Sequence, residues 1–119
     1  MKKTVVIGAS DNPRRYSYLA VQKLKQYKHP VYPIGLHEGE VEGFKIQKGQ
    51  PHIDGVDTIT LYVGPKNQPP LYDYVVSLKP KRIIFNPGTE NPVLENLARD
   101  NGIEVVIGCT LIMLSIGDY

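Results

Sequence analysis

The residues with the clearest chemical potential lie in one short turn near the start of the chain. An apolar, β-branched run over residues 4–7 is followed by three small residues, Gly8, Ala9 and Ser10. Because these residues have almost no side chain, backbone N–H groups and the start of the next helix can approach a ligand closely. Unpaired N–H groups and the helix dipole both favour an anion, so the turn predicts a phosphate site. A tight connection that binds nothing is the alternative.

Two arginines follow this turn. The motif departs from a full GxGxxG pattern, because Ser10 stands at the second glycine position and Pro13 and Arg14 lie near the third. Arg14 and Arg15 could hold phosphate oxygens, since the planar guanidinium binds two oxygens at once. Solvated surface charges are the alternative interpretation, because an exposed charge contributes little by itself.

The end of the second expected strand bears on the type of nucleotide. A nicotinamide cofactor bound in the usual way needs an Asp or Glu there for its ribose hydroxyls. The chain has Gly35, Leu36 and His37 at that place, and Glu38 follows one residue later, so the expected acid is absent from its best position. Neutral or cationic His37, together with the two arginines, suits a nucleotide with an extra ribose phosphate. NADP and coenzyme A are both of this kind.

Other reactive side chains form no recognisable catalytic or metal-binding pattern. Cys109 follows the fifth expected strand, where its thiol could exchange with another thiol, but a small buried hydrophobe is the favoured interpretation. His29, His37 and His52 have no metal-ligand spacing and there is no CxxC motif. We therefore predict no metal site and name no catalytic residue.

Composition indicates one domain over residues 1–119. The net charge is +2, and the basic residues form no long block, so the charge does not indicate a nucleic-acid partner. One cysteine suits a reducing compartment. No apolar run approaches the ~20 residues of a membrane span, and the start shows no signal peptide. We expect a cytoplasmic chain without a membrane or nucleic-acid partner.

Strand and helix patterns alternate along the chain. Helices are predicted over 17–28, 68–79 and 91–101 from their apolar periods, prolines and caps. The predicted strands are 4–7, 31–35, 58–63, 82–85 and 104–107. Residues 36–57 lack a helical period and are expected to form a long loop. The apolar tail 110–116 must dock on its own domain or on a partner, so a homodimer is expected.

This alternation predicts a single Rossmann-like, doubly wound α/β domain with a five-stranded parallel sheet. Right-handed crossovers favour the strand order 3-2-1-4-5, with the switch point between the first and fourth strands. Ligands bind outside the carboxyl ends of the strands at such a point. The small or loop-forming stretches expected there, beside the first turn, are Gly35, Val63-Gly64-Pro65 and Asn86-Pro87-Gly88. Pro33 could provide a rigid apolar wall for an adenine.

The sequence then resembles a known family over nearly its whole length. The matching motifs are Val6-Ile7-Gly8-Ala9-Ser10-Asp11-Asn12-Pro13, Ser17-Tyr18, Val31-Tyr32-Pro33-Ile34, Val41-Glu42-Gly43, Asn86-Pro87-Gly88 and Cys109-Thr110-Leu111. They resemble the small stand-alone coenzyme A-binding proteins. Those proteins are similar to the N-terminal domain of succinyl-CoA synthetase α subunits and of ADP-forming acyl-CoA synthetases.

The resemblance implies that coenzyme A or an acyl-CoA lies over the carboxyl edge of the sheet. By position, Gly8, Ala9, Ser10 and Asn12 would hold the pyrophosphate, with Ser17 near the same phosphates. Pro33 and Gly35 would border the adenosine, and residues 86–88 would line the pantetheine path. The chain departs from the family where Gly35-Leu36-His37 replaces Asn-Pro and a basic residue, and where Val63-Gly64 replaces arginines.

The synthetase relatives transfer phosphoryl groups through a histidine on further domains, so the resemblance implies binding without catalysis. The function predicted is therefore non-catalytic binding of coenzyme A or an acyl-CoA. An NADP- or other nucleotide-dependent enzyme is one alternative. A ligand-free interaction protein on the same fold is another.

Overall fold

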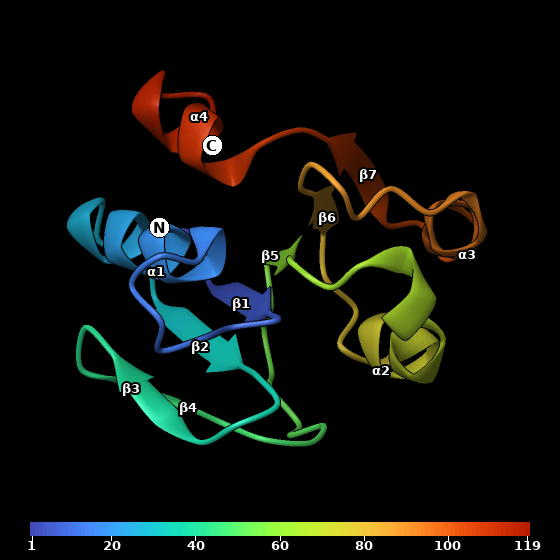
Figure 1. The fold of residues 1–119 in the computed structure, drawn as a ribbon. Helices are drawn as coiled ribbons and strands as arrows, with labels where there is room; N and C mark the ends of the chain where they lie inside the picture. The colour runs from blue at the N-terminus through green and yellow to red at the C-terminus, as the bar shows by residue number, and fades with distance from the viewer.

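A computed structural model describes residues 1–119, and a parallel five-stranded sheet forms its centre (Figure 1). The sheet contains β1 (Thr4–Ile7), β2 (Val31–Ile34), β5 (Thr58–Leu61), β6 (Arg82–Phe85) and β7 (Glu104–Ile107). β1, β5 and β6 are buried along their whole length. Their apolar and β-branched residues suit strands that are covered on both faces. The predicted fold class, a single Rossmann-like α/β domain, is confirmed.

Helices cover both faces of the sheet. α1 (Tyr16–Gln26) and α4 (Thr110–Ser115) lie side by side on one face, while α2 (Tyr72–Ser77) and α3 (Pro92–Asp100) lie on the other (Figure 1). Each layer has its own core. Val6, Leu24 and Leu114 belong to the core under α1 and α4, whereas Phe85 and Leu94 belong to the core under α2 and α3.

The expected strand order, 3-2-1-4-5, is wrong. The sheet has the order β2-β1-β5-β6-β7, which is 2-1-3-4-5 when its five strands are numbered along the chain. The outer side of β2 is occupied by residue 47, because Gly35 N donates to Gln47 O and Gln47 N donates to Pro33 O, both at 3.0 Å. The third parallel strand, β5, pairs with β1 instead.

A β-hairpin accounts for this occupied edge. β3 (Gly39–Val41) and β4 (Phe44–Ile46) pair antiparallel within the predicted loop 36–57 and lie beside β2. Their turn uses Glu42 and Gly43, both with positive φ. No helix forms there, as predicted, but the hairpin was not foreseen. Pro33 suits this edge strand, because its carbonyl and the Gly35 N–H both face Gln47, away from β1.

Prolines also shorten the second predicted helix. Residues 68–79 form one 3₁₀ turn, η2 (Pro69–Leu71), and a short α-helix rather than one long helix, because Pro69 and Pro70 lack the N–H groups that a helix needs. Another 3₁₀ turn, η1 (Pro65–Asn67), precedes this segment. The apolar tail becomes α4, which docks on its own domain through Thr110 and Leu114.

Candidate nucleotide site at the carboxyl edge of the sheet

The switch point of the sheet lies between β1 and β5. The crossover from β1 passes through α1 on one face, and the crossover from β5 passes through α2 on the other. Ligands of open α/β sheets bind in the crevice between strands that diverge in this way. The corrected strand order therefore moves the second wall of the crevice from the end of β6 to the end of β5, residues 62–65.

Two glycines bring the neighbouring strand ends together. Gly8 has φ of +93°, and a Cβ built on it would stand 2.9 Å from the carbonyl carbon and oxygen of Tyr62. A Cβ on Gly35 would stand 2.3 Å from the carbonyl oxygen of Ala9. Both glycines are thus required by contacts between backbones. They set the shape of the edge whether or not a ligand is present.

The first two amides of the turn are already used. Gly8 N and Ala9 N both donate to the carbonyl oxygen of Ile34, each at 2.9 Å. The next amides, those of Ser10 and Asp11, donate to no protein atom. The free donors of the turn therefore begin at residue 10.

The start of α1 offers two more free donors. The amides of Tyr16 and Ser17 have no protein acceptor, and α1 has neither a side-chain cap nor an acidic residue in its first turn. Arg14 and Arg15 are exposed and form no ion pair. The uncompensated dipole of an 11-residue helix and two arginines make this point electropositive. An anion is the natural partner of such a point.

Side chains of the turn order its backbone. Asn12 N donates to Ser10 Oγ at 3.1 Å, and Arg14 N donates to Asn12 Oδ1 at 3.0 Å. Asp11 lies against the β3 strand, since a Cβ on Gly39 would stand 2.7 Å from its Oδ2. Ser10 and Asn12, both expected at the phosphates, thus also fix the path of the chain toward α1.

The end of β2 supplies a different surface. Pro33 and Ile34 are buried, while Leu36 has 86% of its surface exposed and His37 is also exposed. No acid stands at the strand end itself. The structure therefore places an apolar and an imidazole side chain where a nicotinamide-binding domain has its ribose-binding acid.

The end of β6 combines a buried amide with exposed neighbours. Asn86 is 2% exposed, and its Nδ2 donates to Thr60 Oγ1 at 2.7 Å and to Leu61 O at 2.9 Å. Its Oδ1 accepts from Thr110 N at 2.9 Å, so Asn86 joins β5, β6 and the start of α4. Pro87 and Gly88 lie exposed above it. Of the three residues expected along the pantetheine path, these two offer surface to a ligand.

Gln68 was missed in the sequence as a residue that supports the site. It is fully buried, and its Nε2 donates to Val63 O at 2.9 Å and to Thr89 O at 2.7 Å. Its Oε1 accepts from Asn91 Nδ2 at 2.8 Å. Gln68 therefore ties the loop after β5 to the loop after β6. The neighbouring prolines, Pro69 and Pro70, predict only the start of a helix. Nothing in the local sequence pattern indicates that the glutamine side chain is buried.

Tyr62 and Cys109 lie beneath the edge. Tyr62 packs into the core under α1 and α4, and its hydroxyl is buried without a hydrogen-bond partner. Burial raises the pKa of the Tyr62 phenol well above its usual value, so it stays protonated. Packing, rather than stacking on a base, is therefore its observed role. Cys109 is half-buried at the start of α4 and forms no disulfide.

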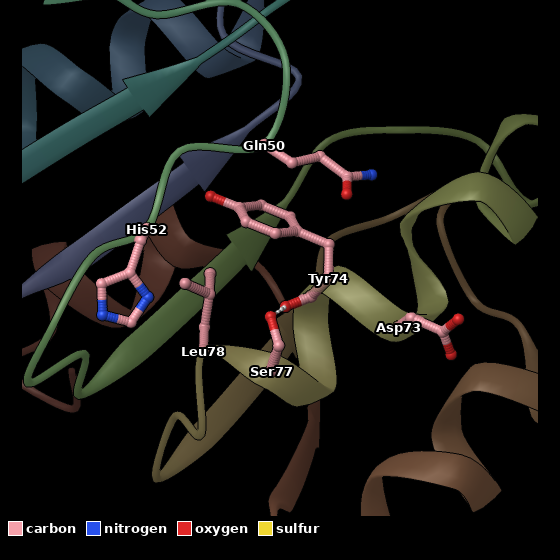
Figure 2. A pocket seen from close by; sticks show the side chains of 6 residues that line it. All are labelled: Gln50, His52, Asp73, Tyr74, Ser77 and Leu78. Atoms are coloured by element: carbon pink, nitrogen blue, oxygen red, sulfur yellow. Dashed lines mark hydrogen bonds between the residues drawn. The ribbon is translucent and has the colours of Figure 1, made fainter.

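Depressions elsewhere on the surface contain no residue of this turn. One of about 310 Å³ lies between α2 and the segment after β4 (Figure 2). Its central polar groups are already paired, because Tyr74 OH donates to Pro51 O and Ser77 Oγ donates to Tyr74 O, each at 2.6 Å. Asp73 points away from this pair (Figure 2). A groove of about 360 Å³ lies between α1 and α4.

The fold and this edge define a Rossmann-like α/β domain with its crevice at the switch point. Comparison with known families then gives a specific assignment: the CoA binding domain family matches residues 2–115, and the chain belongs to that family. No helix is long and apolar enough to cross a membrane.

One curated protein and two solved structures show the extent of the similarity. The α subunit of the ADP-forming acetate–CoA ligase II of Pyrococcus furiosus is 39% identical over 62 residues, which are 51% of this chain and 14% of that subunit. The chain thus spans about one seventh of the length of this curated relative. A solved uncharacterized protein is 55% identical with a TM-score of 0.98, covering 100% of this chain and 98% of that one. A hypothetical protein from Pyrococcus horikoshii OT3 shares the fold, with a TM-score of 0.85 at 24% identity over 97% of this chain and 82% of its own.

Proposed function

We propose that this chain binds coenzyme A or an acyl-CoA at the carboxyl edge of the sheet, as a non-catalytic binding module of the cytoplasm. One observation carries the proposal: the amides of Ser10 and Asp11, in the turn before α1, and of Tyr16 and Ser17, at its uncapped start, donate to no protein atom. They lie at the switch point of a chain that belongs to the CoA binding domain family. These donors suit the diphosphate of the ligand.

The remaining parts of the ligand are assigned to neighbouring residues. In the proposal, Ser10, Asn12 and Ser17 hold the diphosphate, and Gly8 and Ala9 shape the turn beneath it. Arg14, Arg15 and His37 meet the ribose phosphate. Pro33 and Gly35 border the adenosine, and Val63, Asn86, Pro87 and Gly88 form the pantetheine side. The lack of an acid directly at the end of β2, where Gly35, Leu36 and His37 stand, favours such a ligand over NAD, because a nicotinamide-binding domain places its ribose-binding carboxylate there.

A thermal-shift panel tests the proposal. The purified protein is heated with coenzyme A, acetyl-CoA, NADP, NAD or ATP at matched concentrations. A ligand at 100 times its dissociation constant adds about 2.7 kcal/mol to the stability of the protein, which is a clear rise in melting temperature. We expect coenzyme A and acetyl-CoA to raise the melting temperature and NAD to leave it unchanged. A response to NADP alone would replace this function by the enzyme alternative, and no response at all would favour a ligand-free interaction protein.

A further inference from the structure

The outer faces of α1 and α4 form an exposed apolar surface. It consists of Tyr16, Leu19 and Lys23 of α1 together with Leu111, Ile112 and Ile116 of the α4 segment, and we call it the α1–α4 surface. The exposed fractions are 71% for Tyr16, 60% for Ile112 and 69% for Ile116. Monomeric proteins rarely leave several large apolar side chains together in water, so such a surface marks an interaction site.

The composition of α4 strengthens this conclusion. Between Thr110 and Ile116 only Ser115 adds a second polar residue, so the helix is apolar nearly all round. Its own domain buries only Thr110 and Leu114. A helix that is apolar on every side is normally covered on every side. The packing of α4 on α1 therefore covers one apolar face of α4. The face that carries Ile112 and Ile116 is left for a partner to cover.

The direction of the two helices permits a twofold symmetric contact. A groove of about 360 Å³ runs between the helices, lined by Leu19, Gln22, Lys23, Gln26 and Leu111. Ile112 and Ile116 project on the α4 side of it. Both helices run from the carboxyl edge toward the amino edge: α1 follows β1, while α4 begins at the amide bonded to Asn86 and leads to Tyr119, whose hydroxyl bonds Thr4. A twofold axis parallel to the helices then lays each α4 over the α1 of the other copy.

Charge favours the same arrangement. The α1 side of the surface carries Lys23, and the α4 side carries exposed Asp118 just beyond the helix. Neither forms an ion pair within its own chain, where the ion pairs are His52–Asp54 and Lys81–Asp57. The rotation that places α4 over the partner's α1 brings Asp118 to the last turns of that helix, where Lys23 lies. The surface therefore offers each copy an opposite charge.

We propose that a second copy of this chain covers the α1–α4 surface, giving a twofold symmetric dimer. The second copy places its Ile112 and Ile116 beside the groove of the first copy. By symmetry, Ile112 and Ile116 of the first copy lie beside the groove of the second. A standard interface takes about 800 Å² from each partner. Two helices of only 11 and 6 residues carry this surface, so we expect the dimer to be reversible and to depend on concentration.

Sedimentation velocity from about 1 µM to about 1 mM tests the dimer, because a weak association has its midpoint in this range. The wild-type chain is expected to pass from monomer to dimer. Ile112→Glu and Ile116→Glu should each remain monomeric throughout. Leu36→Glu is the matched control, since it puts the same charge on an 86% exposed leucine of the β2–β3 connection and should dimerise normally.

Charge reversal distinguishes this geometry from a non-specific association. Lys23→Glu and Asp118→Lys should each weaken the dimer, and the double variant Lys23→Glu/Asp118→Lys should restore it. Circular dichroism and melting temperatures confirm that each variant is folded. A wild-type chain that stays monomeric to about 1 mM overturns the proposal. So does a dimer that Ile112→Glu and Ile116→Glu leave intact, and a double variant no better than its single variants overturns the parallel orientation of the axis.

Discussion

Gly35 lies directly against Ala9: a Cβ on Gly35 would stand 2.3 Å from the carbonyl oxygen of Ala9. The same two loops are joined by the carbonyl of Ile34, which accepts from the amides of Gly8 and Ala9. The end of β2 thus holds the turn after β1 in place from one side. Because the turn leads straight to the free amides at residues 10 and 11, the close approach of Gly35 sets where those donors point.

Gly35→Ala should therefore destabilise the protein and weaken ligand binding together. The new methyl group must push backbone away from backbone, and such overpacking typically costs about 1–3 kcal/mol. Urea denaturation measures the loss, and the coenzyme A thermal shift measures the binding. Gly64→Ala is the control, because a Cβ on Gly64 meets nothing within 4 Å and its φ is −64°. Equal stability of the two variants would contradict the close packing of Gly35 on Ala9.

Ser10→Glu should abolish the response to coenzyme A while the fold persists. Ser10 is only half-buried, so the larger side chain can be accommodated, but its carboxylate would occupy and repel the phosphate position. Isothermal titration with coenzyme A measures the loss. Asn96→Glu adds the same charge to the exposed face of α3 and should bind as the wild type does. If the Ser10→Glu protein binds normally, the assigned phosphate site is incorrect.

The sequence predicted the elements well where local chemistry decides them. Continuous β-branched runs gave the strands, and Asn91 with Pro92 gave the start of α3, where the Asn91 side chain accepts from Val93 N. The order of strands is a different kind of property. It depends on whether β5 lies outside β2 or beside β1, which is a pairing between segments far apart in the chain. The hairpin of β3 and β4 decides it by occupying the edge of β2.

The candidate site also combines features that the local sequence predicts with features that depend on long-range contacts. Small residues after a strand predicted a turn that exposes its backbone, and the residues from both β1 and β2 converge there. Local sequence could not show that Ile34 O takes the first two amides, because that bond joins residues 25 or more positions apart. Nor could it show that Gln68 and Asn86 are buried and fully bonded. Both lie beside prolines, Gln68 at the start of a predicted helix and Asn86 in a predicted loop, and only the packing of the loops after β5 and β6 gives their amides partners.

Asn86→Ala should lower the free energy of unfolding substantially. The change leaves the buried Thr110 N and Leu61 O without the Asn86 side chain, and each unsatisfied buried group costs about 1–3 kcal/mol. Since Thr110 starts α4, this helix should become less protected against amide hydrogen exchange. Asn96→Ala on exposed α3 serves as the control. A loss below about 1 kcal/mol would mean that the network is not a major support of the edge.

His29 should make the protein less stable in mild acid. Burial and the neighbouring positive charges of the N-terminus, Lys2 and Arg82 lower the pKa of His29, and Lys2 N donates to its Nδ1 at 3.0 Å. The folded state therefore favours the neutral ring. Its contribution is complete above the unfolded pKa of about 6.5 and is lost as the pH falls from there through the lower folded pKa. His29→Asn, whose carbonyl can accept the same bond, should show a flatter dependence of unfolding free energy between about pH 7.5 and pH 5. His37→Asn, at an exposed position, should keep the wild-type slope, and identical slopes for all three proteins would refute the role of His29.

Tyr119 should stabilise the amino edge mainly through its ring rather than its hydroxyl. The ring centroid lies 4.5 Å from the guanidinium carbon of Arg82, a residue that is only 9% exposed and has no carboxylate partner. The hydroxyl bonds Thr4 Oγ1 at 2.6 Å. Tyr119→Phe keeps the cover over Arg82 and loses one hydrogen bond, so it should cost about 0.5–1.5 kcal/mol in urea denaturation. Tyr119→Ala removes the cover from a buried cation as well and should cost clearly more, because a buried charge is expensive unless its surroundings compensate it. Replacing Arg82 by Leu in the Tyr119→Ala background should then recover part of the loss. Equal costs for the Phe and Ala variants would show that the hydroxyl, and not the ring over Arg82, is what stabilises this edge.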